Sequence, residues 1–508
     1  MAFETAVRNP ERYRGILLAL KDFESRVLND ENLLNIVSYL YLIGEVASDK
    51  IQITKTTKID DIAPQVEEIN STRRADGGFP SGFQSRFWTY MRTLSELGFV
   101  YAQYGEKLEF SDIARLLIKG EIDEQEAFSI QAMKYNRKSP YRNVTNDFNF
   151  FRFILEILLR LRKKNKSLSY EQFVVAMFSP SGKVDEFLSI IEKNKFKNYE
   201  SVYKFAKKHF GATTKFKTVT QDYPDVVRRL FIISGFITIR YSSKKMIQIN
   251  ENKSCYIQDL LRVEFLLSNE EKKIARKYFS KLNLKTKELL IIIKKHRKAD
   301  KIDGTLYANK IFDIITTYKI NENIILESIM KIGTRKTVIE EFKEIPDPLK
   351  LEFYISILVA LKYGKEFAIR PNYKADHIGK PYSHASGNMG DLEVYSSKIY
   401  WLIEVTLIRN KTQQLNHETT AVIRHLSSNA EFKKHLIKYL SFIAPIVHDD
   451  TKEFYDISIV KNQKKGYAIS LKPYSIMDFV KVTLVKDNFN DMEAYTKKIM
   501  TDFRAQLS

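Results

Sequence analysis

Two acidic residues, Asp391 and Glu404, offer the clearest chemistry in this sequence. Glu404 lies in the apolar run 399–408, which predicts a buried central strand, where a carboxylate is costly unless it has a partner or a role. Asp391 precedes it by 13 positions and follows the glycine-containing segment 386–390. A loop would deliver the first acid, and a hairpin partner could deliver the second. Two acids that meet at a sheet edge predict a divalent-metal site.

A buried acid neutralised by a basic partner is the alternative interpretation of Glu404, but the neighbouring residues favour chemistry. Glu418 follows Glu404 by 14 positions and His425 follows by seven more, a spacing that places both on one helix face. Hydrolysis of a phosphodiester requires stabilisation of charge on oxygen and a hydroxide made near neutral pH, and Mg²⁺ can contribute to both. We expect Asp391 and Glu404 to hold Mg²⁺, with the carbonyl of Val405 completing its inner shell.

Other residues of the last third could complete such a site. Thr406 stands where nucleases of the PD-(D/E)xK pattern usually carry a lysine, so Glu418 and His425 are the candidates for orienting water. Glu352, on a predicted helix before the first acid, is a further candidate, with a solvated surface acid as the alternative. The segment 448–450, His-Asp-Asp, is a rival metal cluster that ranks lower because it is typical of a surface turn.

Composition indicates a large, basic protein. The 508 residues include 82 Lys and Arg against 62 Asp and Glu, giving a net charge of +20 that favours a polyanionic partner. Double-stranded DNA is the leading candidate and an anionic membrane the second. No apolar run reaches the roughly 18 residues of a spanning helix, and the N-terminus lacks a signal-peptide core, so we expect a cytoplasmic protein with no membrane partner. One cysteine, Cys255, excludes an intrachain disulfide and a thiolate zinc cluster.

Two segments, 85–111 and 226–249, share one pattern: a helix, then Gly-Phe with an aliphatic residue, then a hairpin with a polar turn. The pattern predicts two winged-helix-like subdomains, with a structural packing role as the alternative. A loop before the first copy is rich in glycine and could equally be an ordinary surface loop. The arginines predicted to contact DNA from that loop and from the two helices are Arg73, Arg74, Arg86, Arg92 and Arg228.

Three regions follow from these patterns. Residues 268–337 are typical of successive lysine-rich helices, and the Pro-containing segment 345–348 marks a break before the acidic region. We therefore expect a mixed α and β multidomain protein: a DNA-recognition region over 1–267, a helical linker over 268–337 and an α/β nuclease domain over 338–508.

The chain resembles the AlwI-type family of type IIS restriction and nicking endonucleases. The resemblance extends over nearly the full chain. It rests on the following segments: Arg370-Pro-Asn-Tyr373, Gly379-Lys-Pro381, Gly387-Asn-Met-Gly-Asp-Leu-Glu-Val394, Leu402-Ile-Glu-Val-Thr-Leu407, Glu418 with Arg424-His-Leu426, and the opening Arg8-Asn-Pro-Glu-Arg12 with Lys21-Asp-Phe-Glu24. It implies winged-helix recognition subdomains, a helical linker and a C-terminal PD-(D/E)xK core. It also implies roles for site residues: Asp391 and Glu404 as magnesium ligands, Glu418 and His425 as a supporting pair, and Glu352 as a fifth member.

The resemblance implies an endonuclease that binds a short asymmetric DNA sequence and cuts a few base pairs outside it. Since one catalytic site cuts one strand, a double-strand break needs a second copy or a separate small nuclease subunit. A cognate DNA methyltransferase in the same system is also implied. Two alternatives stay open: a non-catalytic winged-helix DNA-binding protein, and a repair or mobile-element nuclease with looser specificity.

Overall fold

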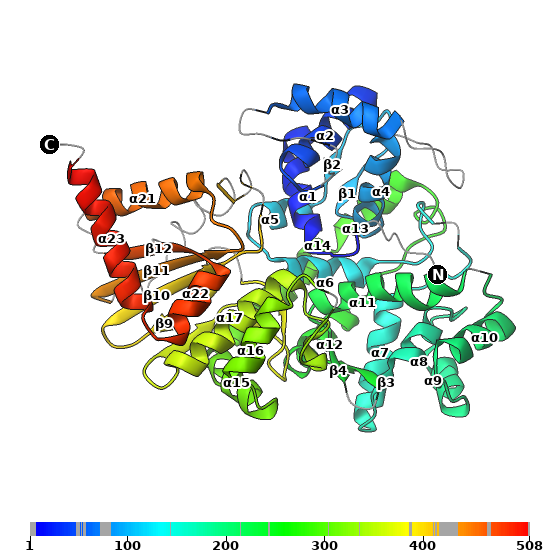
Figure 1. The fold of residues 1–508 in the computed structure, drawn as a ribbon. Helices are drawn as coiled ribbons and strands as arrows, with labels where there is room; N and C mark the ends of the chain where they lie inside the picture. The colour runs from blue at the N-terminus through cyan, green and yellow to red at the C-terminus, as the bar shows by residue number, and fades with distance from the viewer. Residues whose placement is uncertain are drawn as a thin grey trace. The chain divides into compact units, whose positions relative to one another are not determined.

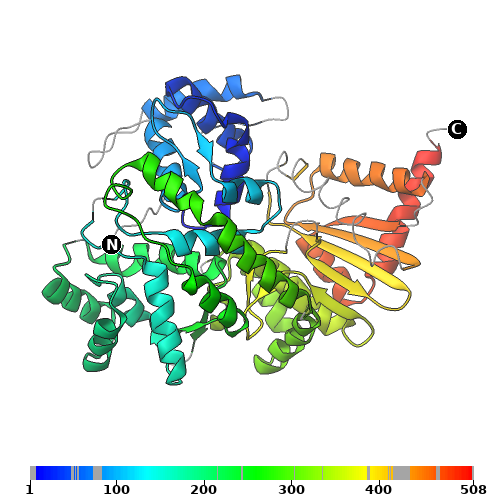
Figure 2. The ribbon, with the colours of Figure 1, turned by 180° about the vertical axis from the view of Figure 1, so that it is seen from behind.

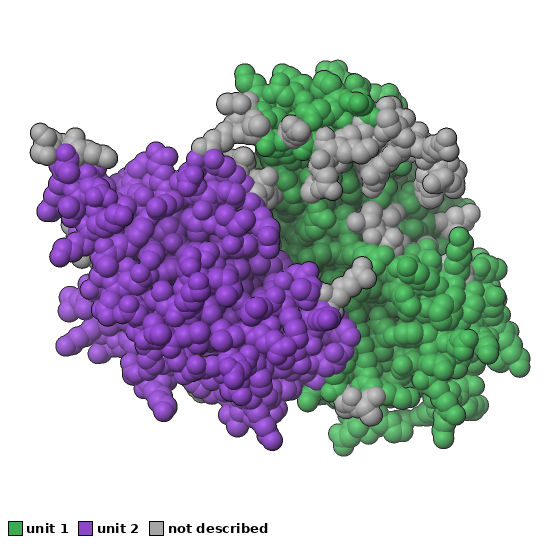
Figure 3. All heavy atoms as spheres, in the orientation of Figure 1, with its two compact units in different colours: residues 1–299 green, residues 300–508 purple. Residues whose placement is uncertain are grey.

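The chain folds into two compact units, which Figure 3 colours separately: residues 1–299 and residues 300–508. A computed structural model describes residues 7–46, 51, 53, 57–71, 83–142, 144–213, 215–241, 244–302, 304–334, 336–385, 389–409, 411, 414–415, 435–464 and 469–505. Helices and strands occur in both units, which confirms the predicted mixed α and β, multidomain class. Among the described residues, no helix is both long enough and apolar enough to cross a membrane.

The first unit is mainly helical, with two small sheets. Its elements are α1 (Arg12–Leu20), α2 (Asp30–Leu42), α3 (Ile59–Ser71), α4 (Phe83–Glu96), β1 (Val100–Tyr101), β2 (Glu109–Phe110), α5 (Asp112–Ile118), α6 (Glu124–Lys134), α7 (Phe150–Lys163), β3 (Leu168–Ser169), α8 (Tyr170–Ala176), α9 (Val184–Lys193), α10 (Tyr199–Phe210), α11 (Tyr223–Ile233), β4 (Ile237–Tyr241), β5 (Lys245–Ile249), α12 (Ser254–Arg262) and α13 (Ala275–Leu284), followed by α14 (Thr286–Ile302), which runs across the division.

Both repeated segments form a helix followed by an antiparallel hairpin, as predicted. The turns after α4 and α11 pass through Gly98 and Gly235, whose φ angles of 75° and 69° favour glycine. Strands β1 and β2 pair Val100 with Phe110, and β4 and β5 pair along their full length. A third strand, β3, adds to β5, so the second hairpin belongs to a sheet of order β3-β5-β4. The helix and hairpin order is confirmed, while the winged-helix identity of these parts stays a prediction.

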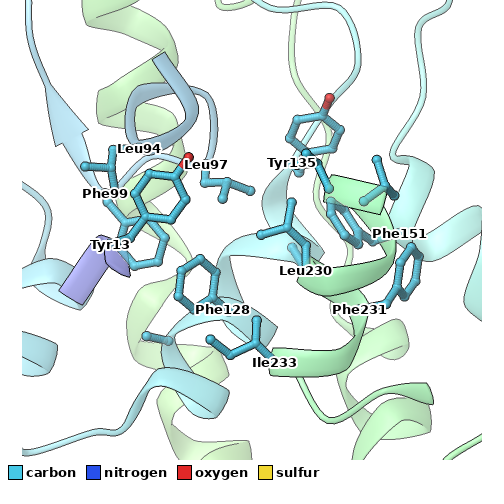
Figure 4. Close-up of a cluster of buried hydrophobic side chains, with 14 of the residues drawn as sticks. Tyr13, Leu94, Leu97, Phe99, Phe128, Tyr135, Phe151, Leu230, Phe231 and Ile233 are labelled. Atoms are coloured by element: carbon cyan, nitrogen blue, oxygen red, sulfur yellow. The ribbon is translucent and has the colours of Figure 1, made fainter. Parts of the chain in front are cut away.

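The two helix–hairpin segments, 85–111 and 226–249, are called modules below, and they share one hydrophobic core. Phe128 of α6 contacts Phe99, just after α4, with ring centroids 5.2 Å apart, and it also lies near Tyr13 of α1. Phe151 of α7 and Phe231 of α11 lie 4.8 Å apart in the same cluster, part of which Figure 4 shows. Tyr135, directly after α6, lies 5.4 Å from Phe151, so the rings at the two ends of α6 contact both parts of this core.

The second unit combines a five-stranded sheet with helices. Its elements are α15 (Gly304–Thr317), α16 (Glu322–Met330), α17 (Asp347–Tyr363), β6 (Ala368–Pro371), β7 (Lys374–Ala375), β8 (Pro381–Ser383), β9 (Leu392–Tyr395), β10 (Ile399–Val405), β11 (Ile437–Ala444), α21 (Asp449–Lys464), β12 (Ile469–Ser475), α22 (Ile476–Leu484) and α23 (Asn488–Ala505).

The main sheet has the strand order β12-β11-β10-β9-β6. Strand β10 pairs in parallel with β11 and antiparallel with β9, so it is a central strand in a mixed sheet. Both of its faces are covered, which explains why its sequence is a continuous apolar run. Helices α17 and α22 lie on one side of the sheet and α21 on the other, as Figures 1 and 2 show from opposite directions.

Alternate residues of β10 enter two different hydrophobic clusters. Trp401 and Ile403 pack toward α17 and α22, whereas Tyr400 and Leu402 pack toward α21. By the two-residue period of a strand, Glu404 belongs to the face of Tyr400 and Leu402. Since both faces are packed, the register of β10 determines on which face of the sheet the Glu404 side chain lies.

The helices of the predicted linker are divided between the two units. Helix α13 lies in the first unit, where Leu282 approaches Gly98 so closely that a Cβ at residue 98 would lie 2.5 Å from the Leu282 Cδ1. Helices α15 and α16 contribute Ile314 and Ile325 to the core of the second unit. The three functional regions 1–267, 268–337 and 338–508 stay a prediction.

We expect Leu440→Ala to lower the free energy of unfolding of the second unit by about 2–5 kcal/mol, because the side chain is fully buried and its removal leaves a cavity. Ile437→Ala on the same strand is the matched control: with the side chain 43% exposed, the loss should be about 1 kcal/mol or less. Urea unfolding followed by circular dichroism measures both. Equal losses would contradict the described packing of β11.

Candidate active site

The hairpin of β9 and β10 brings Asp391 and Glu404 together. Leu392 pairs with Ile403, so continuing the antiparallel register by one residue places Asp391 opposite Glu404. The Asp391 Oδ2 accepts a hydrogen bond of 2.8 Å from the backbone N–H of Val405. Glu404 itself is 4% exposed. A loop and a hairpin partner therefore deliver the two acids, as the sequence predicts.

Gly390 leaves the space that this arrangement needs. A Cβ at residue 390 would lie 2.6 Å from the Glu404 Oε1 and 2.4 Å from the Leu402 Cδ1. Any side chain at this position would displace the Glu404 carboxylate or the strand beneath it. The glycine before Asp391 is therefore required by the close approach of the two acids.

Asn372 fixes the loop that carries Asp391. Its backbone N–H donates to the Asp391 carbonyl at 2.9 Å, and its side-chain amide donates to the Gly390 carbonyl at 2.8 Å. The same amide donates to the Glu393 Oε1 at 2.9 Å. Asn372 thus forms hydrogen bonds to Gly390, to Asp391 and to Glu393 near the start of β9, and these bonds fix the position of the acid.

Glu352 brings a third carboxylate from α17. The residue is 4% exposed, so the acid is buried and does not lie on a solvated helix face. Its Oε1 is hydrogen-bonded to the His384 Nδ1, and its Oε2 has no hydrogen-bond partner within the described part of the chain. A buried carboxylate oxygen without a partner is costly, which indicates that a further group belongs beside it.

The three carboxylates affect one another electrostatically. Burial raises the pKa of Asp391 well above its usual value, and the negative charges of Glu352 and Glu404 raise it further. The hydrogen bond from Val405 and the nearby His384 act in the opposite direction. Asp391 therefore lies within electrostatic reach of Glu352, Glu404 and His384, at the end of the β9–β10 hairpin.

A divalent cation fits this cluster. Crowded carboxylates are oxygen ligands of the type that Mg²⁺ prefers, and a cation would offset the repulsion that raises the pKa of Asp391. In the parts of the chain that the structure describes, no three His, Cys, Asp or Glu side chains are arranged as a complete metal site. The fit consequently rests on the Asp391 and Glu404 pair and on the partnerless oxygen of Glu352.

The other predicted site residues are placed as follows. Glu418 and His425 lie outside the described residues, as do Arg73 and Arg74, and the side chain of Arg86 is not described. Arg92 is half-buried on α4. Arg228 is 8% exposed on α11 and forms an ion pair with Asp225. In the rival cluster His448 bonds to the Arg409 carbonyl, Asp449 begins α21 and Asp450 pairs with Lys411.

Two residues of the site, His384 and Asn372, do not follow from the sequence patterns. His384 comes directly after β8, and only the fold brings it to Glu352, 32 positions earlier in the chain. Asn372 lies between β6 and β7, in the Arg-Pro-Asn-Tyr motif at 370–373. Its position in that motif is the one signal that could have identified it as a positioning residue.

The comparisons with known proteins give one family. The model of the AlwI restriction endonuclease family matches residues 95–302 and 293–482. Among curated proteins there is no match.

Solved structures give remote similarities. The small subunit R.BspD6I2 of the heterodimeric restriction endonuclease R.BspD6I is 20% identical and has a TM-score of 0.27; the alignment covers 35% of this chain and 89% of that one. The BpuJ1 endonuclease binding domain, solved with modified DNA, is 14% identical, with 51% and 95% covered and a TM-score of 0.29. Restriction endonuclease FokI is 14% identical, with 96% and 95% covered and a TM-score of 0.24.

We expect Asp391→Asn to stabilise the protein in EDTA near neutral pH. The pKa of Asp391 is raised in the folded state, so the residue does not lower the free energy of unfolding below its unfolded pKa of about 4, where the carboxyl group is protonated in both states. As the pH rises from there through the folded pKa, the free energy of unfolding decreases, because the folded protein must either retain the proton or bury a repelled charge. The asparagine keeps an acceptor for the Val405 N–H but carries no charge.

The measurement is the thermal midpoint in EDTA between about pH 4 and pH 8. The advantage of Asp391→Asn should be largest at the upper end and vanish toward the lower end. Asp313→Asn, an exposed change on α15, is the control and should follow the wild type throughout. If Asp391→Asn is no more stable than the wild type at any pH, the described crowding of acids is wrong.

Proposed function

The chain belongs to the AlwI restriction endonuclease family, and from this we propose that it is a type IIS enzyme, which binds a short asymmetric DNA sequence and cuts a phosphodiester a few base pairs outside it. The observation that carries the chemistry is the cluster of Asp391, Glu404 and Glu352 at the end of a buried hairpin. A restriction endonuclease acts on DNA, so the substrate of the site is a phosphodiester of double-stranded DNA.

Asp391 and Glu404, with the Val405 carbonyl, would hold Mg²⁺. When bound, the cation would lower the pKa of a coordinated water and offset negative charge on the phosphate. The role of Asn372 and Gly390 is to keep the two carboxylates in place before DNA arrives. A preorganised pair avoids the cost of assembling two charges during the reaction.

Glu352 and His384 would act as positioning residues next to that pair. The hydrogen bond between them fixes the orientation of the Glu352 carboxylate, so that Oε1 is occupied and Oε2 is directed to a further group. Substitution of residues that hydrogen-bond to metal ligands typically lowers metal affinity or activity by about 10–100-fold. Glu418 and His425 are proposed as the supporting pair that orients water, since Thr406 cannot replace a lysine in that role.

One such cluster in a chain cuts one strand at a time. We propose a nick as the product of a single chain, and a double-strand break when a second copy or a small nuclease subunit supplies another site. A cognate DNA methyltransferase would protect the host's own copies of the recognised sequence.

Cleavage of a supercoiled plasmid tests the proposed function. With Mg²⁺ we expect discrete ends at a fixed distance from one asymmetric sequence, and with EDTA no cutting. Asp391→Ala and Glu404→Gln should each lower the rate by roughly 10³-fold or more, because the remaining acid cannot hold the cation alone. Asp313→Asn should cut like the wild type.

Sequencing the ends on both strands distinguishes a nick from a double-strand break. Ends scattered over many sequences would favour a nuclease with looser specificity. Intact plasmid in all conditions, together with tight DNA binding, would favour a non-catalytic DNA-binding protein.

Glu352→Gln and His384→Gln test the positioning pair. Each should lower the cutting rate by roughly 10–100-fold and raise the Mg²⁺ concentration needed for half-maximal cutting, since the Glu352 carboxylate is no longer held in its orientation. The readout is a Mg²⁺ titration at saturating plasmid. A lower maximal rate with an unchanged Mg²⁺ requirement would assign the pair a role apart from the cation.

A further inference from the structure

A cationic pocket of about 380 Å³ lies in the first unit, at the start of α11. This volume falls within the range of about 300–1,000 Å³ of small-ligand sites. Four cations and two carboxylates line it, which leaves two positive charges in excess. These charged residues are Arg8, Lys217, Asp222, Asp225, Arg228 and Lys245.

The carboxylates of the pocket orient its guanidinium groups. Asp225 is shared between Arg228 and Arg229, with the Arg229 Nε 3.1 Å from the Asp225 Oδ2. Asp222 pairs with Arg8 at 3.0 Å. Lys217 is exposed and has no ion pair with any carboxylate in the described parts of the chain. The two acids thus position arginines, while Lys217 stays available to an anion.

Tyr170 forms a buried aromatic wall of the pocket. The residue is 4% exposed, the Lys245 Nζ lies 4.0 Å from the ring centroid, and the Arg228 Cζ lies 5.9 Å from it. The electron-rich face of the ring attracts both cations and helps to hold them in the pocket.

A π-helical turn over Thr218–Asp222 builds one side of the pocket. It follows Lys217 directly and continues into α11, and Thr220, Gln221 and Asp222 all line the cavity. Turns of this kind are rare and occur frequently at functional sites. The unusual backbone and the unusual charge therefore coincide in one place.

We propose that this pocket binds a phosphate group of the DNA backbone, a proposal that rests on DNA being the substrate. Phosphate oxygens accept hydrogen bonds from ammonium and guanidinium groups, and the negative charge of a phosphate would offset the excess positive charge of the pocket lining. A contact of this kind fixes the register and orientation of the protein on the duplex and carries no base information. Arg228 accordingly contacts DNA through the backbone and not through a base edge.

The salt dependence of duplex binding tests the pocket without any cutting. In EDTA, the Lys217→Ala/Lys245→Ala double variant should bind roughly ten-fold more weakly, and the slope of log K against log salt should shrink by about 0.9, because one phosphate fewer is neutralised. The matched control is Lys119→Ala/Lys195→Ala, which removes the same charge from two exposed residues outside the pocket lining. The control should keep the slope of the wild type.

Equal slopes for the two double variants would overturn the proposal, because the effect would then be one of net charge. A change in fold is checked by the thermal midpoint, which should stay within about 2 °C of the wild type. For a variant that fails this check, the wild-type protection experiment below decides.

Chemical protection of the wild-type lysines gives the second measurement. Acetylation followed by mass spectrometry should show Lys217 and Lys245 protected by duplex DNA, with Lys119 and Lys195 modified as in the free protein. Inorganic phosphate at the same phosphate concentration should protect neither. Equal protection by inorganic phosphate would assign the pocket to a free anion, and no protection by DNA would remove it as a phosphate site.

These outcomes are separable from those of plasmid cleavage. A slope difference and lysine protection without any cutting would support the phosphate pocket and contradict the proposed endonuclease function. Cutting at a fixed site, with no slope difference and no protection, would support that function and contradict the phosphate pocket.

Discussion

Electrostatic repulsion among three carboxylates at the end of one hairpin is the constraint around which the second unit is organised. Asp391, Glu404 and Glu352 approach closely enough that burial and mutual repulsion raise the pKa of Asp391 well above its usual value. Such an arrangement costs stability in the absence of a cation, and packed surroundings must therefore maintain it. The glycine at residue 390 and the hydrogen bonds of Asn372 are the local devices that do so.

The mixed sheet explains why these three acids meet. The antiparallel pairing of β9 with β10 fixes Asp391 opposite Glu404, and the parallel pairing of β10 with β11 buries the same strand from its other edge. Helix α17, packed against β6 and β8, brings Glu352 from one side of the sheet, whereas Glu404 belongs to the opposite face of β10. The cluster consequently forms where the strand ends and the two faces meet.

Sequence patterns predicted the elements better than the contacts between them. The hairpin that delivers both acids, the helix that carries Glu352 and the two helix–hairpin modules are local features, visible in apolar periodicity and turn residues. His384 was missed because its partner lies 32 positions away and only folding joins them. The same reason applies to the approach of Arg228 to the Tyr170 ring, because Tyr170 belongs to helix α8, 58 positions earlier in the chain. The ion pair of Arg228 with Asp225, by contrast, is local to α11.

Separate parts of the molecule would divide the work on DNA. A phosphate contact is independent of sequence, so the pocket at the start of α11 would set where the duplex lies, while side chains at base edges would decide which sequence is bound. The proposed cleavage site would need only a phosphodiester, which every DNA offers, and would therefore have to be kept from acting until the sequence has been read. Two compact units would suit this order of events, because one could bind the recognised sequence while the other carries the acids that cut.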